Sequence, residues 1–181
     1  MDYQTPQFFH VMQYADSADG DTIDMVSGNP DWEPPSAIRE GLHEYADGDA
    51  DEFQYPPSDG LAALREEIAA RRNVDPDRVI VTNGTGEANY LGMARALDSD
   101  RGDGVVLIDP VYPYYPGKAS MLGGETRLVA AAHDGGLDTD ATCNAISDNT
   151  ALVVLNTPNN PTGAVYDLDA VEAVVETAAD H

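Results

Sequence analysis

Four short apolar runs, rich in β-branched residues, occur along the chain at residues 79–81, 105–108, 126–129 and 152–155. Such runs, without alternating polar positions, are typical of strands that are buried on both faces of a parallel sheet. The fourth run is followed at once by Asn156-Thr157-Pro158-Asn159-Asn160-Pro161-Thr162-Gly163. Because proline has no N–H for a strand ladder, we expect the strand to end before Pro158.

Patterns with helical spacing separate several of these runs. Leu61, Leu64 and Ile68 recur at helical intervals, with Ser58 or Asp59 as the expected N-cap. Further helices are predicted over residues 87–97, directly after the first strand, and over residues 168–179. Strands that alternate with helices predict an α/β fold: a mostly parallel sheet flanked by helices, with right-handed crossovers. Its ligand is expected beyond the carboxyl ends of the strands.

The first part of the chain has a different pattern. Residues 25–35 form a loop marked by Pro and Gly, with little periodicity. We therefore interpret residues 1–46 as an N-terminal arm or part of a second domain, and residues 47–181 as the α/β domain.

Charge narrows the choice of partners. The 33 acidic and 9 basic side chains give a formal net charge of −24. A surface this negative repels nucleic acids and anionic membranes, so neither is an expected partner. The carboxylates are scattered along the chain, and Lys118 is the only lysine, which favours a halophilic protein over a merely acidic one. With no long apolar run and no basic N-terminal region, the predicted location is cytoplasmic.

The metal-binding residue types form no convincing site. Cys143 is the single cysteine and is expected to act as a small, partly buried apolar residue. Residues 47–51 resemble the start of a calcium loop, but Glu52 and Ser58 stand where that loop needs glycine and a bidentate glutamate. No metal ligand is predicted.

Residues 79–88 have the pattern of a strand, a tight turn and the start of a helix. Glycines at this point allow close backbone approach, and the N-terminus of a helix favours an anion. An ordinary βα turn has the same pattern. A dinucleotide-binding turn is disfavoured, because Asn89 replaces its third glycine and Pro110 directly follows the candidate acid Asp109.

The segment after the second strand, residues 109–116, carries three tyrosines on a loop that prolines stiffen. These tyrosines could pack over the end of the sheet, or they could stack on a planar ligand. Stacking on a planar ligand is favoured, because two other candidate loops are expected at the same edge of the sheet.

Taken in order, these segments resemble the class I/II aminotransferases of pyridoxal-phosphate fold type I, the aspartate aminotransferase-like superfamily. The matching stretches are Ser27-Gly28-Asn29-Pro30-Asp31, Tyr55 with Gly60-Leu61 and Leu64-Arg65, Asn83-Gly84-Thr85-Gly86-Glu87-Ala88, Asp109-Pro110-Val111-Tyr112-Pro113-Tyr114-Tyr115 and Asn159-Asn160-Pro161-Thr162-Gly163. The resemblance implies that residues 1–46 are an arm and part of the small domain. Residues 47–181 would be the N-terminal part of the cofactor-binding large domain.

The resemblance also implies roles for single residues. Thr85, Gly86 and Glu87 would line the loop that binds the phosphate of pyridoxal 5′-phosphate. Tyr112 would stack on the pyridine ring. Asn160 would hydrogen-bond the cofactor's 3′-oxygen, beside a cis Asn160-Pro161 bond. Tyr55 would reach the phosphate of a neighbouring subunit, which implies a homodimer. Gly28, together with Asn160, would lie near the substrate.

The implied activity is amino-group transfer between an amino acid and a 2-oxo acid. The family's Schiff-base lysine, pyridinium-binding Asp and substrate Arg lie beyond the Asn159–Gly163 motif, and Lys118 matches none of them. We therefore expect the N-terminal half of such an enzyme, with no catalytic residue in this chain and no activity of its own. The alternatives are an inactive remnant, a dimerising module, or a C–S lyase or related enzyme of the same fold type.

Overall fold

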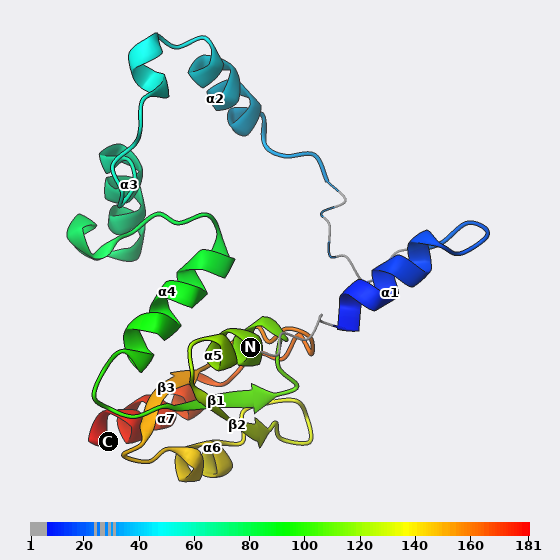
Figure 1. Ribbon diagram of the computed structural model, residues 1–181, viewed down its shortest axis with the longest axis vertical. Coiled ribbons are helices and arrows are strands. Elements are labelled where there is room, and N and C mark those ends of the chain that lie inside the picture. The colour runs from blue at the N-terminus through cyan, green and yellow to red at the C-terminus, as the bar shows by residue number, and fades with distance from the viewer. Residues whose placement is uncertain (1–6, 24, 26–27, 29, 31) are drawn as a thin grey trace. The chain divides into compact units, whose positions relative to one another are not determined.

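The computed structural model describes residues 7–23, 25, 28, 30 and 32–181, which divide into two compact units (Figure 1). One unit comprises residues 7–83, and the other comprises residues 84–181. This division by packing does not test the domain boundary after residue 46, which stays a prediction.

The unit of residues 7–83 contains short helices and no strand among its described residues. Its helices are α1 (Gln7–Asp16), α2 (Ser36–Ala46), the 3₁₀ turn η1 (Ala50–Phe53), α3 (Ala62–Arg72) and the 3₁₀ turn η2 (Pro76–Arg78). α3 confirms the helix predicted from the Leu61–Ile68 spacing. The predicted caps Ser58 and Asp59 are wrong, because Leu61 occupies the N-cap position without a side-chain hydrogen bond. The Asp59 carboxylate instead forms an ion pair with Arg65.

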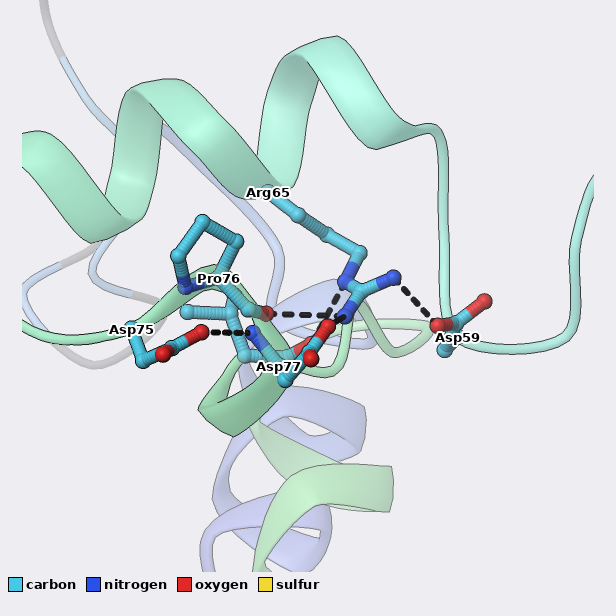
Figure 2. Close-up of polar contacts among 6 residues, drawn as sticks. Asp59, Arg65, Asp75, Pro76 and Asp77 are labelled. Carbon is cyan, nitrogen blue, oxygen red and sulfur yellow. Dashed lines mark hydrogen bonds and ion pairs between the residues drawn. The ribbon is translucent and has the colours of Figure 1, made fainter.

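Arg65 of α3 connects the segments on either side of this helix through its guanidinium group (Figure 2). Its Nε donates to the carbonyl of Val79 at 2.9 Å, and its Nη2 donates to the carbonyl of Pro76 at 2.8 Å. Nη1 pairs with Asp59, and the side chain is only 15% exposed. The planar fork thus joins α3 to Asp59 just before the helix and to residues 76–79 after it, which a lysine could not do. The Leu64-Arg65 element of the motif therefore has a structural explanation.

The strand predicted at residues 79–81 is wrong. In the structure these residues are extended but belong to no sheet. Their backbone groups have other partners: the N–H of Val81 donates to the carbonyl of Asp59 at 3.0 Å, and the carbonyl of Val79 accepts from Arg65. Gly60 has φ +103°, and a Cβ there would lie 2.6 Å from the Val81 side chain, so only glycine permits this approach.

The unit of residues 84–181 is an α/β structure. Its elements are α4 (Thr85–Leu97), β1 (Gly104–Asp109), α5 (Tyr114–Met121), β2 (Glu125–Ala130), α6 (Thr139–Ala145), β3 (Thr150–Val154) and α7 (Leu168–Asp180). The sheet order is β2-β1-β3, and both pairings are parallel, with Leu107 of β1 opposite Leu128 and Val154. The structure confirms the parallel sheet, its three strands, and the helices predicted at residues 87–97 and 168–179.

Helices cover both faces of this sheet (Figure 1). On one face, Val106 and Ile108 of β1 form a buried cluster with Val129, Ala145 and Tyr166, and Ala141 of α6 and Val171 of α7 pack against it. On the other face, Val105 and Leu107 of β1 pack with Ala119 of α5 and with Leu97 of α4. The alternation of β1 side chains between two apolar layers explains its uninterrupted apolar run.

None of the helices in the described part of the chain is both long enough and apolar enough to cross a membrane.

Candidate functional site

Three segments of the 84–181 unit carry the residues that the sequence singled out. They are the start of α4, the segment between β1 and α5, and the turn that follows β3. The last two follow the carboxyl ends of neighbouring parallel strands, which is where ligands bind in open α/β sheets.

The start of α4 has the geometry of an anion site. Gly84 is the N-cap residue with φ 81° and ψ 178°, a conformation that favours glycine. The helix begins at Thr85, so Thr85, Gly86 and Glu87 form its first turn, and all three are exposed. N–H groups in the first turn of a helix have no intrahelical partner and carry partial positive charge, so they suit a bound anion.

The sequence predicted that the three tyrosines after β1 lie on one loop, and for two of them this is wrong. Tyr114 and Tyr115 form the first turn of α5, after Pro113 at its N-cap, and Tyr112 alone stays in the loop. The half-buried Tyr112 ring packs against Tyr114 at 4.8 Å between centroids and edge-on against Tyr115 at 6.3 Å. Burial, together with Tyr114, raises the pKa of the Tyr112 phenol above its ordinary value.

The two adjacent carboxamides after β3 lie in different environments. Asn159 is 6% exposed, and its Oδ1 accepts from both the backbone N–H and the hydroxyl of Thr162, at 3.2 and 3.0 Å. Its Nδ2 donates to the hydroxyl of Tyr166 at 3.2 Å. Asn160 is exposed, and its bond to Pro161 is cis, as the resemblance implied. Asn159 therefore shapes the turn, which leaves Asn160 available to a ligand.

One hydrogen bond joins two of these segments, and the third lies beside α5, the helix that follows the Tyr112 loop. Nδ2 of Asn159 also donates to the carbonyl of Pro110 at 3.4 Å, which ties the turn after β3 to the loop after β1. Lys118 of α5 faces the start of α4, because a Cβ placed on Gly86 would lie 4.0 Å from its Nζ. No motif of the sequence assigns a role to Lys118. Its place beside α4 depends on helix packing, for which no motif or spacing provides a signal.

The other two predicted site residues belong to the 7–83 unit. Tyr55 has a fully exposed side chain, and Gly28 is exposed with φ +64°. Ser27, Asn29 and Asp31 of the same motif lie outside the described residues. The roles of Tyr55 and Gly28 stay predictions.

Cys143 is half-buried between α6 and α7, where its Sγ accepts from the hydroxyl of Thr177 at 3.2 Å. In the described part of the chain, no three His, Cys, Asp or Glu side chains gather in an arrangement that could bind a metal ion.

Known proteins match the sequence and the fold of this chain. The sequence profile of the family "Aminotransferase class I and II" matches residues 20–181. A probable aspartate aminotransferase of Methanocaldococcus jannaschii is 31% identical over 91% of this chain and 44% of its own length. An LL-diaminopimelate aminotransferase of Gloeobacter violaceus is 34% identical over 89% of this chain and 43% of its own length. The chain thus spans less than half the length of these relatives.

A solved structure extends the likeness to the fold. Aspartate aminotransferase of Thermus thermophilus with maleate matches 99% of this chain and 49% of its own, at 29% identity and a TM-score of 0.85. The profile match, these relatives and the α/β architecture agree with one another. The chain belongs to the aminotransferase class I and II family.

Proposed function

We propose that this chain is part of a pyridoxal-phosphate-dependent aminotransferase that transfers an amino group between an amino acid and a 2-oxo acid. The observation that carries the proposal is the convergence of the α4 start, the Tyr112 loop and the Asn159–Gly163 turn in a member of this family. The relatives described above are named as aminotransferases, which favours amino-group transfer over C–S bond cleavage.

The residues present fit each part of the cofactor. The first turn of α4 offers N–H donors to a phosphate group, and a buried amine without a hydrogen-bond partner lies beside it. Tyr112 offers an aromatic face, because its ring is half-buried and braced by two further tyrosines. Asn160 offers an exposed carboxamide on a turn that Asn159 fixes. When bound, the cofactor supplies an electron sink for the bond broken at the substrate's α-carbon.

In this proposal the chain's own residues bind and orient. The N–H groups of residues 85–87 bind the phosphate, Tyr112 stacks on the ring, and Asn160 donates a hydrogen bond to the ring oxygen. Tyr55 reaches the phosphate of a second subunit in a homodimer, and Gly28 lies near the substrate. The proposed location is the cytoplasm of a halophile, in keeping with the net charge of −24.

The coding sequence downstream of His181 gives the first test of this proposal. We expect a continuous reading frame that encodes Ser-x-x-Lys and, later, an arginine, because the family's imine-forming and substrate-binding residues follow the Asn159–Gly163 motif. The product of that frame should transfer an amino group from an amino acid to 2-oxoglutarate. An in-frame stop directly after His181 would contradict the proposal and favour an inactive or dimerising module.

A further inference from the structure

Lys118 is the only lysine of the sequence, and its Nζ is buried with no hydrogen-bond partner in the structure of the described residues. A buried ammonium group without a counter-charge is costly. Burial accordingly lowers the pKa of Lys118 below its ordinary value. Because nearly all buried polar groups in native proteins are paired, an unpaired one calls for a partner, which can be water, an ion or a ligand.

The surroundings of the amine indicate where that partner would lie. The Nζ is 5.3 Å from the centroid of the Tyr114 ring, within the range of a cation–π contact. It also lies near the first turn of α4, because a Cβ placed on Gly86 would be 4.0 Å from the Nζ. Gly86 has no side chain to fill the space between its backbone and the amine.

Positive charge from two elements therefore meets beside Gly86. The first turn of α4 contributes N–H groups and the positive end of the helix dipole. Lys118 of α5 contributes an amine that solvent does not reach. Glu87 adds a negative charge to the same turn, but it is exposed, so water and salt screen it more strongly than the buried amine.

We propose that Lys118 is a phosphate-binding residue: its ammonium group and the N–H groups of Thr85 and Gly86 together bind a phosphate monoester at the start of α4. This inference rests on the proposed function, in which that ester belongs to the cofactor. The structure thereby assigns a role to a side chain that lies outside every motif of the sequence.

The donor set suits a phosphate monoester better than a carboxylate. Phosphate oxygens point in several directions, so one group accepts from two backbone N–H groups and from an ammonium group on another helix. At neutral pH a monoester also carries between about 1.5 and 2 negative charges, which offsets the desolvation of the amine better than a single charge.

The test measures binding to the whole 181-residue chain by equilibrium dialysis in molar potassium chloride. The probes are pyridoxamine 5′-phosphate, pyridoxamine and inorganic phosphate. None of them has an aldehyde, so covalent capture by an amine cannot contribute. Lys118→Met removes the charge at nearly constant length, and Lys118→Arg keeps the charge. Circular dichroism confirms that each variant is folded.

We expect Lys118→Met to weaken pyridoxamine 5′-phosphate binding by about 10–100-fold, the loss of one hydrogen bond to a charged group. Pyridoxamine binding should not change, and Lys118→Arg should retain most of the affinity. If the unsubstituted chain and Lys118→Met prefer pyridoxamine 5′-phosphate over pyridoxamine by the same factor, the inference is wrong and the proposed function stands. If inorganic phosphate binds through Lys118 but the pyridine ring adds nothing, the inference stands and the proposed function is wrong. If the unsubstituted chain shows no preference for phosphate, both are wrong.

Discussion

The two units of this chain are stabilised in different ways. Residues 84–181 enclose a hydrophobic core around β1, in which Val105, Leu107 and Val106 are at most 1% exposed. In the described part of residues 7–83, Ala69 is the only buried apolar residue, and large side chains such as Trp32 and Leu42 are 76% and 64% exposed. Within residues 59–79, Arg65 and its carbonyl and carboxylate partners connect α3 to the segments that flank it. One unit thus has an apolar core, and the other has a polar cluster around α3.

This difference predicts unequal responses to salt, and here the largest effect is expected. At a net charge of −24, self-repulsion grows as the Debye length rises from about 3 Å at 1 M to about 30 Å at 0.01 M salt. We expect the chain to unfold or aggregate when salt is removed, and residues 7–83 to lose order first, because no core offsets the repulsion there. Circular dichroism and amide exchange across a salt series would test this. A flat response would contradict the halophilic interpretation, and simultaneous loss in both units would contradict the comparison.

The next largest effect is expected for the core of β1. Leu107→Ala should destabilise residues 84–181 by about 2–5 kcal/mol. The Leu107 side chain is fully buried between the sheet and the helices α4 and α5, so its truncation leaves a cavity. Leu42→Ala is the matched control: this leucine of α2 is 64% exposed, and the change should stay within about 0.5 kcal/mol. Denaturant titration in molar salt measures both. Equal losses of unfolding free energy in the two variants would contradict the conclusion that only residues 84–181 have an apolar core.

Arg65→Met should affect the polar cluster alone. The variant leaves the carbonyls of Pro76 and Val79 without their donor, so we expect residues 59–81 to lose about 1.5–3 kcal/mol of local stability. Arg71→Met removes an ion pair of the same helix whose arginine is 76% exposed, and should cost less than about 1 kcal/mol. Exchange of the Val81 amide reports the difference. If the Val81 amide is protected from exchange equally in Arg65→Met and in the unsubstituted chain, Arg65 does not stabilise residues 59–81.

The smallest effect on stability separates the two neighbouring asparagines. Asn159→Ala should destabilise the turn after β3 by about 1–2 kcal/mol, because the backbone N–H and hydroxyl of Thr162 lose their acceptor. Asn160→Ala should leave stability unchanged and weaken only pyridoxamine 5′-phosphate binding, since Asn160 is exposed. Thermal unfolding and dialysis on both variants separate the roles. An equal stability loss in the two variants would contradict the assignment of Asn159 to the turn and of Asn160 to ligand binding.

The parts of the fold that follow from the sequence are those that apolar burial decides. The runs of β1, β2 and β3 were predictable as strands of one parallel sheet. Burial on both faces holds for β1, whereas β3 is half-buried and β2 is exposed except at Val129. The run at residues 79–81 has the same composition but is no strand, because Asp59 and Arg65 take up its backbone groups. Local pattern does not report which partner a backbone group finds. The helix α5 was not predicted, because Pro116 and Gly117 are typical of loops. Proline is nevertheless tolerated in the first turn of a helix, where Pro116 lies.

The candidate site divides in the same way. Residues 85–87, Tyr112 and Asn160 stand in contiguous motifs, so the family resemblance could assign them roles. The buried Asn159 differs from Asn160 only in its tertiary contacts, and the sequence shows the two as equivalent. Lys118 belongs to no motif. Its nearness to Gly86 arises from the packing of α5 beside α4, which only the structure reveals.

The most direct test of the account is pyridoxamine 5′-phosphate binding to chains substituted at Gly86. A Cβ at this position meets only Nζ of Lys118, at 4.0 Å, so Gly86→Ala should fold and retain most of the affinity. Gly86→Asp would place a carboxylate beside that amine, where it takes up the positive charge and repels the phosphate. Equilibrium dialysis should show binding to Gly86→Ala and a loss of at least about 100-fold in Gly86→Asp, the effect of losing a charge-assisted contact and adding a repulsive one. Equal affinity of the two variants would show that the start of α4 is not the phosphate site.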